Sequence, residues 1–454
     1  MRRPLFALLL WFGLASAARA DGTFYTLVTN GPAATHLNVV FFSEGYTNGQ
    51  NKVFTNQALQ FGNYIRSTPP FDQYSNYFNI FAIFVASVDS GSDHPLSSNL
   101  KNTYFNSTYY SYGTERLITI PPNNLDGKYA DGQGKIYTLL QQWMPQYDLP
   151  VVIVNDSEYG GSGGAILVVS TNASSPEIAV HELGHTFAKL GDEYTSAYPG
   201  YPNTEEPNTT RETRRDFVKW NSWINPTTPV PTPDTSPYSS LIGLFEGAHY
   251  QTTGWYRPKH DCKMRTLGQP YCSVCAEQMV VTLYSSVYAI AEVFPGTNLF
   301  TLAPGGGTNL SAVIRHPAGQ KLNIQWLLNG VPISNATNAA FNLKAADLHA
   351  GTNEIRMRLN DPTPLVHAGP DGLFVENAIW RVNVLNPPPS LQIERQAEGL
   401  KITASEILGN TLLESAASPS ALANDWTPTS TLTADTELLV SPTNAVRFFR
   451  LRKL

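Results

Sequence analysis

The residues best suited to chemistry form the short motif His181-Glu182-Leu183-Gly184-His185. Two histidines four positions apart lie on one face of a helix, one turn from each other. Their imidazoles can then bind one Zn²⁺ at about 2.0–2.1 Å each. The glutamate beside the first histidine would lie next to a metal-bound water, where it can act as a general base. The motif therefore predicts metal-assisted hydrolysis.

Signals at both ends of this motif predict that it lies on a helix. Ser175-Pro176-Glu177 combines a capping serine, a proline and an acidic side chain, which are residue types that begin helices. Gly191 is expected to end the helix and to turn the chain, because glycine accepts a positive φ. We therefore expect a helix of about four turns that carries both histidines.

A catalytic zinc site needs a third protein ligand besides two histidines. Asp192 and Glu193 follow the expected turn directly. In a continuous helix Asp192 would lie roughly 16 Å along the axis from His181, so it can bind only if the chain turns back at Gly191. Asp192 is the preferred third ligand and Glu193 is the alternative. More distant acidic candidates are Glu246 and Glu277.

Strands and helices alternate ahead of the motif. Apolar runs predict buried strands at residues 36–44, 77–87, 150–155 and 165–170. Helical periodicity occurs at residues 50–66 and 132–144. This alternation is typical of an α/β or mixed α+β domain. The glycine loop at 159–164 leads into the strand 165–170, which is expected to be an edge strand that pairs with an extended peptide substrate.

The three cysteines, Cys262, Cys272 and Cys275, lie close together in the sequence. In an oxidising compartment we expect one disulfide and one spare thiol, and the sequence does not decide whether Cys272 or Cys275 pairs with Cys262. The alternative is a zinc site that His260 completes, since a cysteine-based site needs three or four ligands.

The motif and its surroundings resemble the IgA-peptidase family of zinc metallopeptidases, a metzincin-like group. Residues 181–194 match its pattern H-E-x-G-H-x-F-x-x-L-x-D-E-Y. Further segments that resemble the family are residues 42–46, 70–80, 90–95, 155–163 and 256–275. Ser43-Glu44 departs from the Gly-Asp that is usual in the family. The resemblance extends over about residues 24–290.

This resemblance implies a single catalytic zinc, held by His181, His185 and Asp192, with Glu182 as the base. It also implies that a methionine of the 256–275 segment lies beneath the zinc. That residue would be Met264, and the alternative is an ordinary core methionine. From the same segment, Tyr256 is a candidate for stabilising the oxyanion, and the alternative is a packing tyrosine.

Residues 1–20 have the features of a secretory signal peptide, with two arginines, an apolar run and Ala18-Arg19-Ala20. We therefore expect cleavage near Ala20 and a protein that is secreted or lies at the cell surface. No other segment reaches the roughly 18 apolar residues of a membrane span. Without the three arginines of this segment, 27 Lys and Arg face 36 Asp and Glu, and the net charge near −9 argues against a nucleic-acid partner.

The pattern changes at about residue 292, beyond which short strand-like runs alternate with turn signals. The peptidase domain is expected to span residues 21–292. Trp326, in one of the runs that follow, favours an immunoglobulin-like β-sandwich over residues 293–386. Residues 387–454 are expected to form a small C-terminal β module. We expect these two parts to contact a surface or a glycan.

The predicted fold class is therefore α/β (α+β), a metzincin-like zinc peptidase domain followed by two small all-β domains. The predicted function is an exported zinc endopeptidase that acts on a protein or peptide. One alternative is a non-catalytic binding or adhesion protein on a peptidase scaffold, which rests on the β modules. The other is a zinc hydrolase of cell-wall amides, because zinc chemistry does not itself select the amide.

Overall fold

The computed structural model describes residues 22–122, 131–385, 390–405, 411–419, 425–432, 437–441 and 446–453. The expected signal peptide at residues 1–20 lies outside them, so export stays a prediction. The chain forms two compact units. The first combines Met1–Ala291 with Val313–Asn323 and Leu359–Glu376, and the second contains the remaining residues. The domain boundaries at residues 20, 292 and 386 stay predictions.

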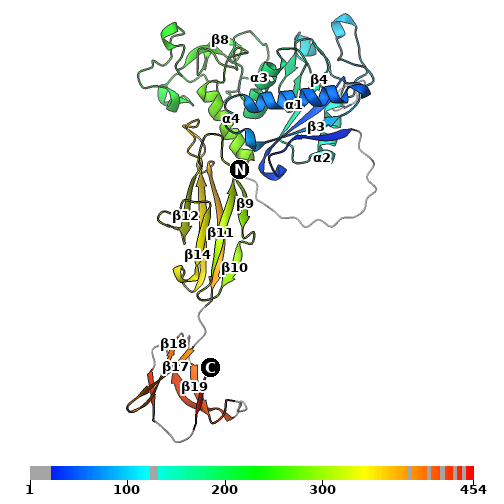
Figure 1. The fold of residues 1–454 in the computed structure, drawn as a ribbon. Helices are drawn as coiled ribbons and strands as arrows, with labels where there is room; N and C mark the ends of the chain where they lie inside the picture. Colours follow the sequence, from blue (N-terminus) through cyan, green and yellow to red (C-terminus); the bar gives the residue numbers. More distant parts are fainter. Residues whose placement is uncertain are drawn as a thin grey trace. The chain divides into compact units, whose positions relative to one another are not determined.

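The first unit is built on a six-stranded mixed sheet (Figure 1). In spatial order its strands are β1 (Thr23–Val28), β3 (Phe78–Phe84), β2 (Leu37–Glu44), β4 (Leu149–Val154), β6 (Leu167–Val169) and β5 (Gly161–Ser162). The four inner strands are parallel, and β1 and β5 are antiparallel edge strands. Every residue of the inner strands is buried, as expected for a parallel sheet that is covered on both faces.

Four helices belong to this unit: α1 (Asn51–Ser67), α2 (Gly132–Trp143), α3 (Ser175–Ala188) and α4 (Ser273–Ser286). In Figure 1, α1 and α3 lie on one side of the sheet and α2 lies on the other. Successive side chains of β3 point to opposite faces of the sheet. Ile83 packs in the same cluster as Leu140 of α2, whereas Phe84 contacts Phe54 of α1. The mixed α/β class is confirmed.

The predicted edge strand at residues 165–170 is wrong. Its β6 pairs with β4 on one side and with β5 on the other, so its backbone groups are already bonded. The edge of the sheet near α3 is therefore β5, which lies inside the glycine loop. A Cβ at Gly161 would approach the Ile178 side chain to 2.7 Å, so glycine allows this strand to lie directly on α3.

The predicted end of the motif helix at Gly191 is also wrong. Helix α3 ends at Ala188, and Lys189 adopts the left-handed conformation with φ 57°. The Lys189 and Leu190 N–H groups both donate to the carbonyl of Gly184, which completes the C-terminal turn. The reversal that the third ligand requires is therefore present, but it begins two residues earlier than the glycine.

The second unit consists mainly of strands. A five-stranded sheet has the order β10 (Leu299–Leu302), β16 (Val375–Val384), β15 (Gly351–Asn360), β12 (Asn323–Leu328) and β13 (Val331–Pro332). A three-stranded sheet has the order β14 (Ala340–Lys344), β11 (Gly307–Ile314) and β9 (Ile290–Phe294). Trp326 stacks on Trp380 of its own sheet and on Phe341 of the other, which joins the two sheets through one aromatic core. The immunoglobulin-like β-sandwich over residues 293–386 stays a prediction.

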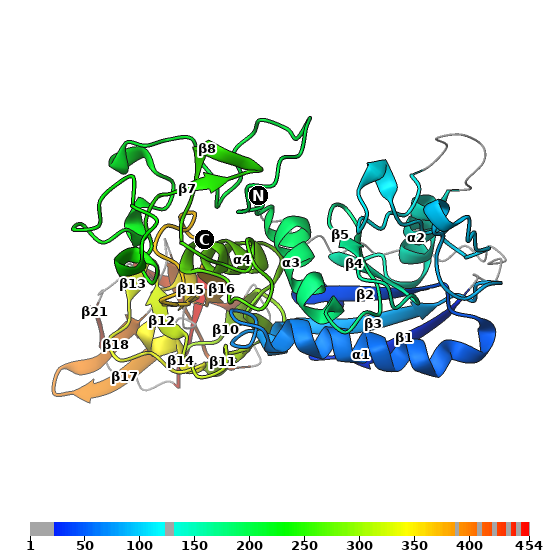
Figure 2. The same ribbon diagram turned by 90° about the horizontal axis from the view of Figure 1, so that it is seen from above.

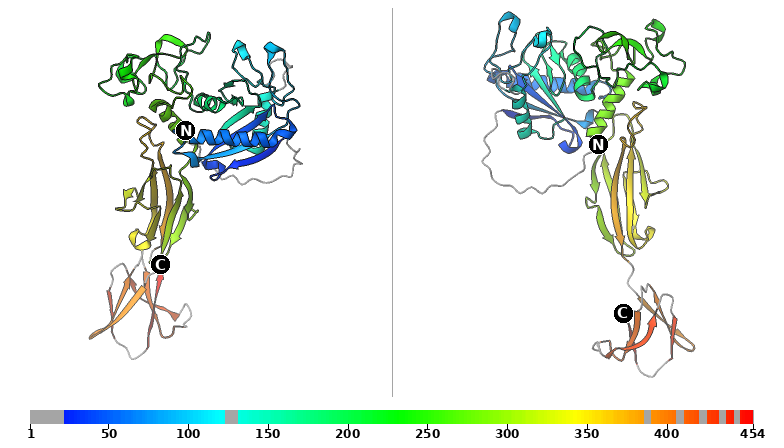
Figure 3. Two further views of the ribbon diagram at one scale, coloured as in Figure 1. Left: turned by 45° about the horizontal axis from the view of Figure 1, so that its top comes forward. Right: turned by 180° about the vertical axis from the view of Figure 1, so that it is seen from behind.

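Six further strands form two small sheets nearer the C-terminus (Figure 3). One has the order β17 (Ser390–Gln396), β18 (Gly399–Ser405) and β21 (Glu437–Val440). The other has the order β20 (Thr427–Leu432), β19 (Thr411–Ala416) and β22 (Phe448–Lys453). Ile402 and Leu413 are fully buried in the core between these strands. Within the described part of the chain, no helix is long and apolar enough to cross a membrane.

Glu44, at the end of β2, holds part of the long loop between β3 and α2. Its buried carboxylate accepts hydrogen bonds from the Thr103 hydroxyl at 2.6 Å and from the N–H groups of Phe105 and Ser107 at 2.8 and 2.7 Å. Burial raises the pKa of this carboxyl, although these bonds act in the opposite direction. Glu44, which stands where the family usually has aspartate, thus supplies the hydrogen-bond acceptor for this buried loop.

Replacing Glu44 with Ala should lower the free energy of unfolding by about 3 kcal/mol, because it leaves three buried donors without their acceptor. Urea denaturation followed by tryptophan fluorescence would measure the change. The control is Asp72→Ala at an exposed carboxylate, which should change stability by less than about 0.5 kcal/mol. Equal losses in the two variants would contradict the anchoring role of Glu44.

Candidate metal centre

The two motif histidines and Asp192 converge on one point. Asp192 Oδ1 lies 3.1 Å from His181 Nε2 and 3.3 Å from His185 Nε2. The two Nε2 atoms are 3.3 Å apart. The Asp192 side chain is 4% exposed, and the two imidazoles are 11% and 21% exposed. The structure therefore brings together the three residues expected to bind the metal.

The other nitrogen of each imidazole is held by a backbone carbonyl. His181 Nδ1 lies 2.9 Å from the Lys263 oxygen, and His185 Nδ1 lies 2.7 Å from the Leu190 oxygen. A carbonyl only accepts hydrogen bonds, so each Nδ1 is the donor, and Nε2 is the nitrogen of each ring that faces Asp192. This is the arrangement in which metal-binding histidines are usually oriented.

The electrostatics of this cluster call for a positive charge at its centre. Burial lowers the pKa of His185, but the Asp192 carboxylate outweighs that effect and raises the pKa to about 10. Burial raises the pKa of Asp192, but the charges and hydrogen bonds of His185 and His181 together outweigh this effect and lower the pKa. Among the described residues, Oδ1 of Asp192 is buried with no hydrogen-bond partner. Two imidazole nitrogens and one carboxylate oxygen are a donor set that suits a catalytic zinc ion.

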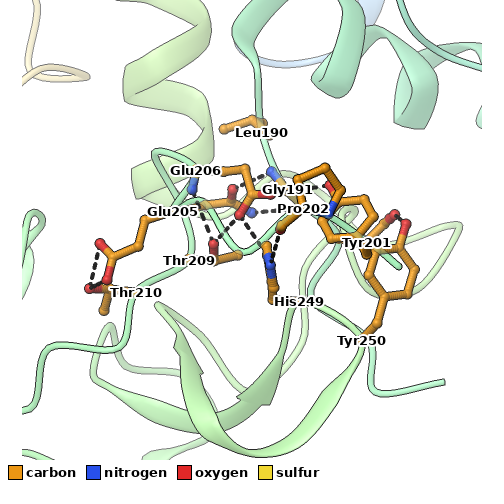
Figure 4. A network of polar contacts seen from close by, with 12 residues as sticks. Leu190, Gly191, Tyr201, Pro202, Glu205, Glu206, Thr209, Thr210, His249 and Tyr250 are labelled. Carbon is orange, nitrogen blue, oxygen red and sulfur yellow. Dashed lines mark hydrogen bonds and ion pairs between the residues drawn. The ribbon is translucent and has the colours of Figure 1, made fainter. Parts of the chain in front are cut away.

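Gly191 has a different role from the one expected, because it allows a close approach by Glu206. A Cβ at this position would lie 2.6 Å from Glu206 Oε2. Asn208 fixes the Gly191 backbone in both directions, with bonds of 2.7 Å from its N–H and 2.9 Å to its carbonyl. Figure 4 shows Glu206 beside Gly191, where it also bonds His249 at 3.0 Å and Tyr201 at 3.1 Å.

Glu193, the alternative ligand, points away from the histidines. Its Oε1 accepts a hydrogen bond from Asn208 Nδ2 at 2.9 Å and lies 3.4 Å from Cys275 Sγ. The distant acidic candidates also lie elsewhere. Glu246 is paired with Tyr256 in a hairpin, and Glu277 accepts a hydrogen bond from Trp223 Nε1 at 2.6 Å. The geometry therefore favours Asp192 among the four acids.

The turn that contains Met264 lies against α3. A Cβ on Gly184 would be 2.5 Å from Met264 Sδ, and Met264 is fully buried. The neighbouring Lys263 donates from Nζ to Glu177 at 2.6 Å, near the start of the same helix. Its carbonyl is the one that orients His181. Met264 therefore packs against the motif helix, and its place beneath the zinc stays a prediction.

A cleft runs past the motif in two directions. A cavity of about 500 Å³ is lined by the three candidate ligands and Glu182, and a second cavity of about 480 Å³ also reaches Glu182 and His181. A Cβ on Gly163 would lie 2.9 Å from Glu182 Oε2, so glycine leaves space there for the carboxylate. Glu182 thus lies at the junction of the two cavities.

Tyr256 is not brought into this cleft. It lies in β8 (Gln251–Arg257), and its backbone pairs with Thr210 and with β7 (Phe245–Ala248). It lines neither of the two cavities. The packing alternative therefore fits its position better than a role at the oxyanion.

Tyr250 is a further residue of the site, which no sequence motif indicates, and its hydroxyl donates to Asp192 Oδ2. His249 and Tyr250 form the turn between β7 and β8, and both have positive φ, 55° and 60°. The turn is docked because the His249 N–H donates to the Asp192 carbonyl at 2.9 Å. No Asn-Gly or Asp-Gly pair marks this hairpin in the sequence, so its usual signal is absent.

The cysteines are close together but not bonded, in contrast to the expected disulfide. Cys275 Sγ lies 3.7 Å from Cys262 Sγ and 3.6 Å from Cys272 Sγ. His260, expected as a possible fourth zinc ligand, is directed elsewhere, where its Nδ1 contacts Asp234.

The sequence model of one family, described as IgA Peptidase M64, matches residues 25–237 and 234–283. The match covers more than half of the chain. The chain belongs to the IgA peptidase M64 family. Membership confirms the resemblance, and it places the candidate metal centre inside the part of the chain that defines this family of metallopeptidases.

Comparisons with individual proteins add no argument for this M64 member. No curated protein matches it. A quinonprotein alcohol dehydrogenase-like protein from Bacteroides thetaiotaomicron is 11% identical with a TM-score of 0.16, and the match covers 33% of this chain and 40% of that one. A chaperone–tip adhesin complex of CFA/I fimbriae is 13% identical with a TM-score of 0.14, covering 35% and 92%. Such low TM-scores establish no common fold.

Replacing Gly184 with Ala should lower the free energy of unfolding by about 1–2 kcal/mol. The added methyl group collides with the buried Met264, and this cost outweighs the roughly 1 kcal/mol that alanine gains in helix propensity. Thermal and urea denaturation would measure the loss. Gly49→Ala is the matched control, since its added Cβ meets nothing within 4 Å. If both variants were equally stable, the contact between α3 and the methionine turn would not constrain the helix.

Proposed function

We propose that this protein is an exported zinc-dependent endopeptidase. The observation that carries the proposal is the convergence of His181, His185 and Asp192 on one buried, partnerless carboxylate oxygen beside Glu182. These three residues would hold the zinc, and both imidazoles are already oriented for it by backbone carbonyls. Membership in a peptidase family supports a protein or peptide as the substrate.

When bound, zinc polarises the scissile carbonyl and lowers the pKa of water. Glu182 accepts a proton from the attacking water and delivers it to the leaving amine. Asp192 Oδ2 is occupied by the Tyr250 hydroxyl, so Oδ1 is the oxygen directed at the histidines. The Tyr250 turn and the methionine turn therefore position the ligands without taking part in proton transfer.

The shape of the cleft supports cleavage within a chain rather than at its end. The two cavities share Thr114, Leu117, His181, Glu182 and Tyr194. An extended peptide that passes through both would have residues on each side of the bond facing Glu182. In the larger cavity, four tyrosines provide aromatic rings for substrate side chains; they are Tyr194, Tyr198, Tyr201 and Tyr250.

Glu182→Gln should retain the fold and the bound zinc but reduce peptide cleavage by about 100-fold or more, because an amide cannot accept the water proton. Cleavage-site profiling on a peptide library measures activity, and elemental analysis measures zinc. Glu246→Gln, at an exposed carboxylate outside the cleft, should cleave normally. Undiminished cleavage by Glu182→Gln would contradict the proposed mechanism.

Asp192→Asn should lose zinc more readily than the wild type during dialysis against a chelator, because the amide removes the only anionic ligand. Tyr250→Phe should weaken zinc binding by a smaller factor, about tenfold, as expected for a residue that orients a ligand. Zinc content at a series of chelator concentrations would rank the three proteins. Wild-type retention by Asp192→Asn would exclude this carboxylate as a ligand.

A further inference from the structure

We propose that Cys262, Cys272, Cys275 and Glu193 form a second metal site, which binds a structural Zn²⁺ separate from the catalytic one. One ligand atom of each residue lies within 4.8 Å of the other three, and all four residues are buried. The fourth ligand is the Glu193 carboxylate and not His260. Glu193 is far from the cysteines in the sequence, so no local spacing links it to them.

The distances between these atoms suit a tetrahedral zinc ion. With Zn–S bonds of about 2.3 Å, tetrahedral geometry places sulfurs about 3.8 Å apart and a sulfur about 3.5 Å from a carboxylate oxygen. Cys275 Sγ lies 3.7 and 3.6 Å from the other two sulfurs and 3.4 Å from Glu193 Oε1. A disulfide would need about 2.05 Å, and Cys275 is almost equally distant from both possible partners.

The surroundings of the Glu193 carboxylate favour a bound cation. The Glu193 side chain is fully buried, and its Oε2 has no hydrogen-bond partner within the described residues. A buried carboxylate with one oxygen unsatisfied is costly, whereas a bound divalent cation compensates its charge. The Cys272 N–H donates to Cys262 Sγ at 3.2 Å, a bond that stabilises a thiolate. Zinc binding would release the thiol protons to solvent without any change of oxidation state.

The four ligands join the segments that build the catalytic centre. Glu193 is adjacent to Asp192, and Cys262 is adjacent to Lys263, whose carbonyl orients His181. The Glu193 N–H also donates to the Met264 carbonyl at 2.8 Å. The remaining ligands, Cys272 and Cys275, lie at the start of α4. A zinc ion here would therefore cross-link the turn after α3, the methionine turn and α4.

The first experiment separates the two sites by removing the catalytic ligands. The full chain should contain two zinc ions, and His181→Ala/His185→Ala should contain one. X-ray absorption at the zinc edge of this variant should show three sulfurs at about 2.3 Å and one oxygen at about 2.0 Å. The proposal is overturned if the variant holds no zinc, if its zinc has only nitrogen and oxygen ligands, or if its mass reveals a disulfide. None of these results depends on whether the catalytic proposal holds.

A second experiment tests the carboxylate in the same double-variant background. Glu193→Gln should lower zinc affinity about tenfold or more, and chelation of the zinc should lower the melting temperature by about 5 °C or more. Glu277→Gln is the matched control, because its carboxylate is buried like that of Glu193 but bonds Trp223 and not the sulfurs. Equal zinc affinity in the two variants would exclude Glu193 as a ligand, and an unchanged melting temperature would exclude a structural role.

Discussion

The site depends on one constraint, the placing of a buried carboxylate between two imidazoles that belong to the preceding helix. Asp192 can reach them only because the chain reverses immediately after Ala188. Lys189 adopts a left-handed conformation there, at a cost of about 1 kcal/mol or more for a residue with a side chain. The bonds to the Gly184 carbonyl and the docking of Gly191 against Asn208 offset this strain. A buried negative charge between two imidazole nitrogens then calls for a cation.

Three distant segments maintain this arrangement, and each acts on a different atom. The Lys263 carbonyl orients His181, the Tyr250 hydroxyl binds one oxygen of Asp192, and Asn208 holds the backbone before it. None of these contacts transfers a proton in the proposed reaction. Their contribution is to remove rotational freedom from the ligands, which a rigid, buried parallel sheet makes possible by fixing α3.

The adjacent acids Asp192 and Glu193 face different surroundings. Asp192 faces the histidines and the cleft, and Glu193 faces the three cysteines. The two residues that compete for one role in the sequence therefore serve two centres in our proposals. This pairing gives a physical reason for consecutive acids after a helix, where they oppose its dipole.

Features that depend on local periodicity or spacing could be predicted from the amino-acid sequence. The buried strands, the helices α1 and α2, the shared face of His181 and His185, and the family all follow from short-range patterns. The folded chain was needed to establish which acid meets the histidines, that Tyr250 and not Tyr256 reaches the site, and that β5 is the edge strand. The cysteine cluster with Glu193 belongs to the same group. These outcomes depend on contacts between residues far apart in the chain, such as Asp192 with Tyr250, and no local pattern encodes such contacts.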